Sequence, residues 1–364
     1  MIIDKLERDF LELVAVSIDY PCRLMNRLGC SNRSAYRLIE KLISDGYIRK
    51  HKKDNLCSLR ITKKGQSILL KENPERFEKF MEKRRYCKSE VVKRLRWHRI
   101  ASTYTSMRNA EVGIFLDEKP NLFSKTGTDS ASIDKAFFYS AVEIKDLGPE
   151  CTKIKFSRAV GIMLCSNEVG FIVYNTDNSL MKWSSRAEQR LYGVLTGILL
   201  NNSVQVNDFA GIMIGNNMGT ALTQLLSSGG VKNCFFKVDN TFNEFYYIPE
   251  DNDGDVLLRL LTNYEKRRKI RDMVMQSFRI TNNMLPFASD GVDSEERATL
   301  LAYEFDMEKI RKFKSGIEMF EEPGIVICFD FQREVLAKYF GKLARIVTLS
   351  RELVAKELDV WNEK

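Results

Sequence analysis

The sequence predicts a mixed α+β protein in which a small, basic, mostly helical N-terminal region precedes a larger α/β body. Three observations support this prediction. Apolar residues recur at helical spacing through residues 4–44, and two short strand-like runs follow within residues 47–62. Positive charge is concentrated in the first hundred residues. After about residue 108, strand-like runs alternate with helix-like stretches, which is typical of a body with a partly parallel sheet.

Length and composition limit the classes of function. A chain of 364 residues with 44% hydrophobic and 29% charged residues is long enough for two or three globular domains. No apolar run approaches the roughly 20 residues that cross a bilayer, and the first residues lack a signal-peptide layout. We therefore expect a cytoplasmic protein without membrane contact. The eight cysteines form no CxxC pair, and with only two histidines in the chain we expect reduced thiols and no bound metal.

The distribution of charge indicates an anionic partner for the N-terminal region. Residues 1–100 contain 25 Lys and Arg against 13 Asp and Glu, whereas the rest of the chain contains 32 against 36. Nucleic acid is the leading candidate for a partner of such a region. The alternative is a basic face that is merely solvated.

Local signals divide residues 1–70 into short elements. Asp4 is placed to cap a helix that runs to Ile18, and Pro21 fits the first turn of a short second helix that Gly29 ends. Ser31 is the expected N-cap of a third helix over residues 32–44.

A basic hairpin is expected after the third helix. Two strands, over residues 47–51 and 56–62, are joined by the polar turn Lys52-Lys53-Asp54-Asn55. Thr62 can then cap a final short helix over residues 63–70.

Three helices followed by a hairpin resemble the winged helix-turn-helix family over about seventy residues. The phrases Leu-Ile-Ser-Asp-Gly-Tyr-Ile (42–48) and Leu-Arg-Ile-Thr-Lys-Lys-Gly (59–65) carry the resemblance. It implies that the 32–44 helix enters the major groove of double-stranded DNA while the hairpin follows the backbone or reaches a minor groove. The residues expected to contact DNA are Ser31, Asn32, Arg33, Ser34, Tyr36, Arg37, Lys41, Lys52, Lys53, Asn55 and Arg60. A winged helix used for protein contacts is the alternative.

A basic helical connector is expected over residues 71–107, with helices at 76–81 and 91–107. Residues 71–100 hold 11 Lys and Arg against five Asp and Glu. This surface either extends the phosphate contacts or joins two copies of the chain. The residues placed for phosphate contact are Lys83, Arg84, Arg85, Lys93 and Arg94.

The remaining chain is expected to form an α/β body over residues 108–290 and a C-terminal α/β subdomain over residues 291–364. The expected strands lie at 136–144, 160–165, 169–174, 210–214, 234–238, 324–329 and 344–349. The expected helices lie at 184–200, 220–226, 332–340 and 351–358. Two polar stretches, 249–255 and 288–296, are expected to be surface loops.

One tripeptide in the body suggests an alternative function. Glu143-Ile144-Lys145 closes an expected strand and matches the E-x-K half of the PD-(D/E)xK nuclease motif, in which two carboxylates hold Mg²⁺ and the lysine orients the attacking water. Asp129 or Asp134 would be the upstream acid, and Glu111 a third acid on a helix. The body contains no histidine, which excludes Ser-His-Asp and Cys-His catalysis within it. We therefore favour a protein that is not an enzyme and has no cofactor, and Mg²⁺ enters only with the nuclease alternative.

A second, looser resemblance covers part of the body. The stretches 138–145, 157–163, 173–176 and 181–183, behind the basic N-terminal region, resemble the replication-relaxation proteins of plasmids and conjugative elements. This resemblance implies a role in replication, mobilisation or regulation of a mobile genetic element, and it supplies no active-site residues. The leading hypothesis is a DNA-binding homodimer or higher homo-oligomer whose body mediates self-association or recruits other replication or mobilisation proteins. A transcription regulator whose body senses a ligand is the third hypothesis.

Overall fold

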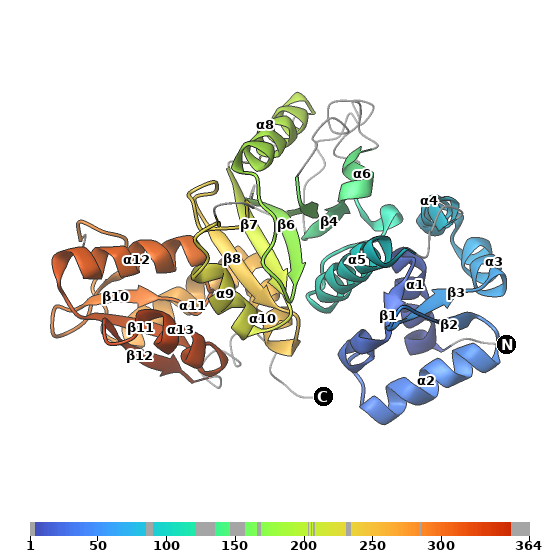
Figure 1. The fold of residues 1–364 in the computed structure, drawn as a ribbon, viewed down its shortest axis with the longest axis horizontal. Helices are drawn as coiled ribbons and strands as arrows, with labels where there is room; N and C mark the ends of the chain where they lie inside the picture. Colours follow the sequence, from blue (N-terminus) through green and yellow to red (C-terminus); the bar gives the residue numbers. More distant parts are fainter. Residues whose placement is uncertain are drawn as a thin grey trace. The chain divides into compact units, whose positions relative to one another are not determined.

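The structure is a computed structural model that describes residues 4–84, 90–120, 135–145, 157–165, 169–202, 204, 206, 208–230, 234–283 and 285–350. It confirms the mixed α+β fold class (Figure 1). The chain divides into two compact units, a first unit over Met1–Lys119 and a second unit over Pro120–Glu363. Among the described helices, none is long and apolar enough to cross a membrane.

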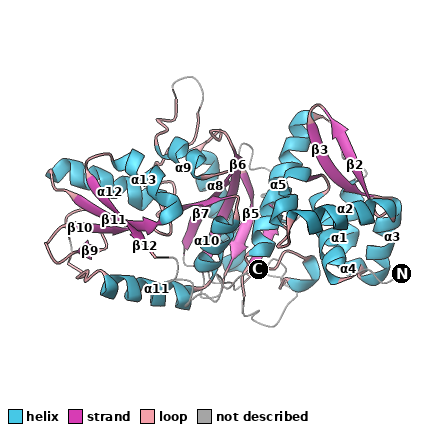
Figure 2. Cartoon of the chain, turned by 90° about the horizontal axis from the view of Figure 1, so that it is seen from below, coloured by secondary structure: helices cyan, strands magenta, loops and turns pink. Residues whose placement is uncertain are grey.

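The first unit combines helices with a three-stranded antiparallel sheet in the order β1-β3-β2. Strands β2 and β3 are seen side by side in Figure 2. Its elements are α1 (Lys5–Ser17), β1 (Tyr20–Pro21), η1 (Cys22–Arg27), α2 (Asn32–Ser44), β2 (Ile48–Lys53), β3 (Leu56–Ile61), α3 (Lys63–Glu72), α4 (Pro74–Arg84), α5 (Val91–Asn109) and η2 (Leu116–Glu118). The expected order of helices and hairpin within residues 1–70 is present, and β1 is an additional short strand that the sequence reading did not predict.

Side-chain caps fix where the helices of the first unit begin. Asp4 and Glu7 form a capping box at the start of α1, with the Asp4 carboxylate 2.8 Å from the Glu7 amide nitrogen. Ser31 accepts from the amide of Ser34 at 3.2 Å and caps α2. Thr62 accepts from the amide of Gly65 and caps α3. These are the caps that the sequence predicted for Asp4, Ser31 and Thr62.

Close packing at the base of the hairpin requires a glycine at position 65. A Cβ atom added to Gly65 would lie 2.4 Å from the carbonyl oxygen of Tyr47 and 2.7 Å from a side-chain carbon of Ile61. The first of these atoms belongs to the backbone and cannot move aside without shifting the chain. Gly65 therefore allows α3 to approach the two hairpin strands.

The helices expected as a connector, α4 and α5, are part of the first unit rather than a link between domains. Both pack against α1, and α5 also packs against β1 and η1. The inward face of α5 is unusually polar, because Arg94, His98, Ser102 and Thr105 are all buried. A polar inward face hides the apolar periodicity by which a sequence reveals a packed helix.

The second unit contains two sheets and the helices that connect their strands (Figure 1). Its strands are β4 (Phe137–Ser140), β5 (Ala159–Leu164), β6 (Val169–Asp177), β7 (Asp208–Gly215), β8 (Phe245–Pro249), β9 (Gly291–Val292), β10 (Ala298–Leu301), β11 (Gly324–Phe329) and β12 (Ala344–Leu349). Its helices are α6 (Ala141–Lys145), α8 (Ser185–Asn201), α9 (Met218–Leu225), α10 (Asn252–Thr262), α11 (Tyr264–Ser277), α12 (Met307–Phe320), η3 (Asp330–Gln332) and α13 (Arg333–Phe340).

Both sheets of the second unit mix parallel and antiparallel pairs. The first has the order β4-β5-β6-β7-β8, antiparallel from β4 to β6 and parallel from β6 to β8. The second has the order β12-β11-β10-β9, with only the β9–β10 pair antiparallel. The parallel pairs are joined through α8, α9, α12 and α13 in the manner of βαβ units.

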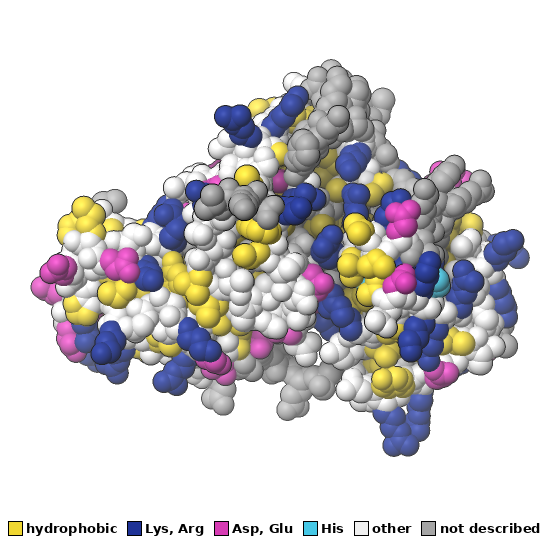
Figure 3. Space-filling view, in the orientation of Figure 1, with side chains coloured by type: hydrophobic (Ala, Val, Ile, Leu, Met, Phe, Trp, Pro, Cys, Tyr) yellow, Lys and Arg dark blue, Asp and Glu magenta, His cyan; other side chains and the backbone are white. Residues whose placement is uncertain are grey.

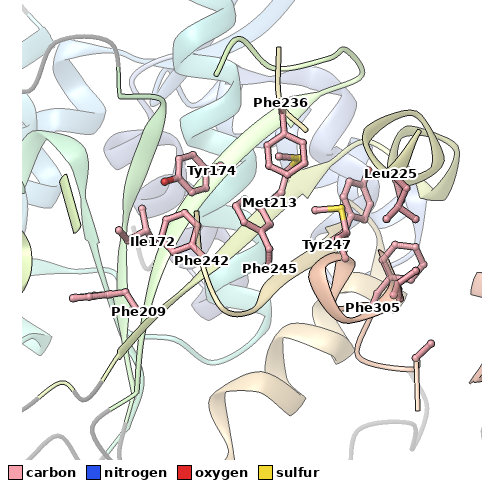
Figure 4. Packing of buried hydrophobic residues seen from close by; sticks show 14 of the residues in the cluster. Ile172, Tyr174, Phe209, Met213, Leu225, Phe236, Phe242, Phe245, Tyr247 and Phe305 are labelled. Atoms are coloured by element: carbon pink, nitrogen blue, oxygen red, sulfur yellow. The ribbon is translucent and has the colours of Figure 1, made fainter. Parts of the chain in front are cut away.

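One hydrophobic cluster extends through both sheets of the second unit. Figure 4 shows Tyr174, Phe236, Phe242 and Phe245 gathered over the first sheet. Tyr174 stacks on Phe245 with ring centroids 5.7 Å apart. The cluster also includes residues of β10, β11, α12 and α13. Residues of the second sheet and its helices therefore share a hydrophobic core with the first sheet.

Several predictions of secondary structure in the second unit were wrong. The run 136–144 is not one strand, because β4 ends at Ser140 and α6 follows. Residues 234–238 form only an isolated bridge between Phe235 and Lys182. The stretch 249–255 is not a loop, since Asp251 caps α10 by accepting from Gly254 at 2.9 Å. The stretch 288–296 contains β9, and the helix expected at 351–358 lies outside the described residues.

Substitution of Gly65 tests the packing at the base of the hairpin. Gly65→Ala should lower the free energy of unfolding by about 1–3 kcal/mol, because the new methyl group meets backbone. Urea unfolding followed by circular dichroism measures the change. The control is Gly193→Ala in the interior of α8, where a Cβ would have no neighbour within 4 Å. That variant should be stabilised by about 0.5–1 kcal/mol. Equal effects of the two substitutions would contradict this interpretation.

Candidate nucleic-acid interface

The helix α2 presents one apolar and one polar face. Ala35, Leu38, Ile39 and Leu42 are buried in the first unit. The opposite face is exposed and consists of Asn32, Arg33, Tyr36, Arg37 and Glu40. Among these residues, Tyr36 is 58% exposed, which is high for an aromatic side chain. Five of the residues predicted for DNA contact, counting Ser34 with Asn32, Arg33, Tyr36 and Arg37, thus lie at the surface of one helix.

The start of α2 is suited to an anion. Its first turn contains no acidic side chain, so the positive end of the helix dipole is not neutralised there. Ser31 and Ser34 hold their hydroxyl groups 2.9 Å apart at this end, and both are exposed. Backbone N–H groups and hydroxyls at a helix N-terminus are common ligands for phosphate.

The hairpin adds a second exposed basic element. Lys52, Lys53 and Asn55 are exposed at its tip, as predicted. Asp54 and Asn55 both have positive φ, at 52° and 60°, which is the geometry of a two-residue type I′ turn. Within the described part of the chain, neither Arg33, Arg37, Lys52 nor Lys53 forms an ion pair. Their charges are available to a partner.

The exposed face of α2 and the strand β2 are joined by an ion pair. Lys50 of β2 lies 2.7 Å from the Glu40 carboxylate of α2. Because side chains alternate along a strand, Lys50 and Lys52 point to the same side of the hairpin. The exposed face of the helix and this side of the hairpin therefore adjoin at the Lys50–Glu40 pair, and together they form the basic surface. Dark-blue Lys and Arg side chains are frequent over the first unit in Figure 3. Lys50 is exposed and belongs to this surface although it was not among the residues predicted from the sequence, whereas the exposed Arg49 points to the opposite side of the hairpin.

The buried carboxylate of Asp19 connects the hairpin to the helices behind it. Asp19, between α1 and β1, is fully buried. Its Oδ1 accepts from the Ser58 hydroxyl at 2.6 Å and from Arg60 Nε at 2.5 Å. Its Oδ2 accepts from Arg94 Nε at 2.9 Å and lies 3.1 Å from His98 Nε2. Residues of β3 and α5 are thus tied to the end of α1.

Arg94 reaches from α5 to the hairpin itself. Its guanidinium donates to the carbonyl oxygens of Lys53 at 2.8 Å and of Leu56 and His51 at 3.3 Å, and to the Ser58 hydroxyl at 2.9 Å. Lys53 and Leu56 flank the turn. The one fully buried arginine of α5 therefore holds both ends of the hairpin tip by their backbone.

Hydrogen bonding determines the ionisation of Asp19. Burial by itself raises the pKa of this carboxyl, but the hydrogen bonds from His98, Arg60, Ser58 and Arg94 outweigh burial and hold the pKa well below its usual range. The carboxylate is therefore charged at neutral pH and compensates the buried guanidinium of Arg94.

The network corrects two predicted contacts. Arg94 cannot reach a phosphate, because none of its side chain is exposed. Arg60 is only 11% exposed and donates to Asp19, so it belongs to the same network rather than to the surface. In both cases a buried carboxylate that is distant in sequence binds the charge that was expected at the surface.

Of the other residues predicted to contact DNA or phosphate, two form ion pairs within the chain and three have side chains outside the described residues. Lys41 is exposed but forms an ion pair with Glu7 of α1. Lys93 is exposed at the start of α5 and pairs with Glu90 at 3.1 Å. The side chains of Lys83 and Arg84 and the whole of Arg85 lie outside the described residues.

The residues proposed for the nuclease alternative do not occupy the expected positions. Glu143 and Lys145 lie in α6 and not at the end of a strand. The Glu143 carboxylate accepts from the backbone nitrogen of Ser140 at 2.8 Å and from its hydroxyl at 2.7 Å. Asp134 lies outside the described residues. Among the described residues, no group of three or more His, Cys, Asp or Glu side chains is arranged to hold a metal ion.

Comparison of the chain with protein-family models, with curated proteins and with solved structures finds no match. The geometry of the first unit is therefore the observation on which a function can be proposed.

Removal of the Asp19 charge should destabilise the first unit. In Asp19→Asn the buried guanidinium of Arg94 loses its compensating charge, and breaking a buried pair in this way costs about 3–5 kcal/mol. The control is Asp9→Asn, because the Asp9–Arg108 pair also joins α1 to α5 but is about one-third exposed. That variant should lose less than about 1 kcal/mol. Urea unfolding distinguishes the two, and equal losses would contradict the importance of the buried network.

Acid should remove the Asp19 contribution. The pKa of Asp19 is lowered by folding, so the unfolded chain binds its proton first as the pH falls. The stabilisation is complete above the ordinary carboxyl pKa of about 4 and declines as the pH falls below it. The difference in unfolding free energy between the natural protein and Asp19→Asn should therefore narrow from about pH 5 to about pH 2. A difference that stays constant over this range would show that folding does not lower the pKa of Asp19.

Proposed function

We propose that the first unit is a winged-helix domain that binds double-stranded DNA, with α2 in the major groove and the β2–β3 hairpin as the wing. The observation that carries this proposal is the exposed face of α2, which contains Asn32, Arg33 and Arg37 and lies beside the basic hairpin. Within the described residues, the two arginines form no ion pair. Arginine pairs with guanine and asparagine with adenine through two hydrogen bonds in the major groove. The free start of α2 suits a backbone phosphate.

The helix and the hairpin have different tasks in this proposal. Lys52 and Lys53 at the hairpin tip contribute positive charge without a geometry that selects a base, so they bind phosphates. Arg33 and Arg37 lie one helical turn apart and can approach neighbouring base pairs. Arg94 takes no part in the contact itself, and it positions the wing through the carbonyl oxygens beside the turn.

We further propose that the protein acts in the cytoplasm, in the replication, mobilisation or regulation of a mobile genetic element. The support is the resemblance of residues 138–145, 157–163, 173–176 and 181–183 to replication-relaxation proteins. The second unit then serves self-association or the recruitment of other replication or mobilisation proteins. Winged-helix proteins commonly read paired half-sites as dimers, which supports a homo-oligomer on DNA.

A salt titration of DNA binding tests the proposal. The full chain is mixed with a labelled library of random duplexes, bound sequences are selected, and the affinity for the selected duplex is measured over a range of salt. The logarithm of the association constant should fall linearly with the logarithm of salt concentration. The double variant Arg33→Ala with Arg37→Ala should bind about 10-fold more weakly or worse and reduce the salt slope by about 1–2.

A second pair of arginines provides the control. Arg186 and Arg190 are exposed on α8 and are also four residues apart. Arg186→Ala with Arg190→Ala removes the same charge from the second unit and should leave affinity within about twofold, because neither arginine belongs to the proposed contact surface. Binding that is insensitive to salt, or equal losses in the two double variants, would overturn the proposal.

A further inference from the structure

Two cysteines meet at the edge of the basic surface, although they are 35 positions apart in the chain. Cys22 follows β1 directly and Cys57 lies in β3. The antiparallel register pairs Pro21 with Ser58, so the next residues along, Cys22 and Cys57, are cross-strand neighbours. Their sulfur atoms lie 2.8 Å apart. Neither cysteine bonds to any other sulfur in the described residues.

We propose that Cys22 and Cys57 are a redox-active dithiol that closes to a disulfide on reaction with a low-molecular-weight disulfide such as oxidised glutathione. A disulfide has its sulfur atoms about 2.05 Å apart, so the thiols need to approach by less than an ångström. Opposed residues of an antiparallel pair have Cα atoms about 4.5–5.5 Å apart, which lies within the range of Cα separations that disulfides span.

The environment of the pair orders the two chemical steps. Cys57 is exposed and Cys22 is half-buried. Burial and the neighbouring thiol raise the pKa of Cys22 to about 12, which disfavours its thiolate, and the exposed Cys57 therefore meets the oxidant first. The Cys57 thiolate attacks one sulfur of oxidised glutathione, forming a mixed disulfide and releasing one glutathione thiolate. Cys22 then attacks the Cys57 sulfur, its proton passes to the second departing glutathione, and two thiols have been oxidised while one disulfide has been reduced.

The position of the pair gives the disulfide a structural consequence. Cys57 pairs across the hairpin with Lys52, one of the exposed basic residues of the wing. The crosslink would enclose α2 and β2 in one covalent loop and fix the hairpin to η1. A loop of this length restricts the unfolded chain, so oxidation should stabilise the first unit.

Peptide mapping of the full chain tests the site. The native protein is incubated with oxidised glutathione, remaining thiols are alkylated in denaturant, and the tryptic peptides are analysed without reduction. Peptides Asp9–Arg23 and Asp54–Arg60 each contain one cysteine and should appear joined by a disulfide. Dithiothreitol should separate them. The melting temperature of the first unit should rise by about 5 °C or more on oxidation.

The controls separate this pair from unspecific thiol chemistry. Cys22→Ser and Cys57→Ser should each abolish the linked peptide, whereas Cys30→Ser, at another half-buried cysteine of the same unit, should leave its yield unchanged. If a serine variant fails to fold, a comparison on the natural protein replaces it. The linked peptide should form when oxidation takes place in native buffer and should not form when it takes place in denaturing urea. A glutathione adduct on Cys57 without the linked peptide, or links among all cysteines at similar yield, would overturn the proposal.

Discussion

Asp19 lies where the end of α1, the strand β3 and the helix α5 meet, and its carboxylate neutralises the guanidinium of Arg94 inside the first unit. Removing two charges from water is unfavourable, and the attraction between them compensates only when further hydrogen bonds satisfy both groups. Here they do. Asp19 accepts from four side chains, and Arg94 also donates to three carbonyl oxygens of the hairpin. The hairpin owes its position to this buried interaction as well as to its own strand pairing.

The position of the hairpin in turn shapes the surface. A two-residue turn defines the register of β2 and β3, but it does not determine where the hairpin lies relative to α2. Arg94 holds the backbone on both sides of the turn, and the pair between Lys50 and Glu40 joins β2 to the exposed face of α2. The buried guanidinium of Arg94 positions the hairpin through its backbone, so the exposed arginines and lysines are not needed for this task. They stay available for an anionic partner. The proposed dithiol would add a covalent tie at the same place, where β1 meets β3.

Sequence reasoning succeeded where the signal was local. The Ser31 cap, the apolar stripe of α2 and the Asp54-Asn55 turn each depend on residues a few positions apart, and each is present in the structure. Arg94 was misplaced because its carboxylate partner is 75 residues away, and nothing local distinguishes a buried arginine from a phosphate-binding one. Glu143 is a different case. Ser140 and Glu143 have the S-x-x-E spacing of a capping box, but the apolar run before them favoured a longer strand.

The most direct test of the buried interaction is a double-mutant cycle on stability with Asp19→Ala, Arg94→Met and the double variant. Asp19→Ala leaves the fully buried guanidinium of Arg94 without a carboxylate, and Arg94→Met leaves Asp19 with Arg60 as its remaining guanidinium partner. The double variant removes both fully buried charges. The free energies of unfolding should therefore be strongly non-additive, with the double variant more stable than the sum of the single losses predicts by about 2 kcal/mol or more. Losses that add to within about 0.5 kcal/mol would contradict a central role for the Asp19–Arg94 pair.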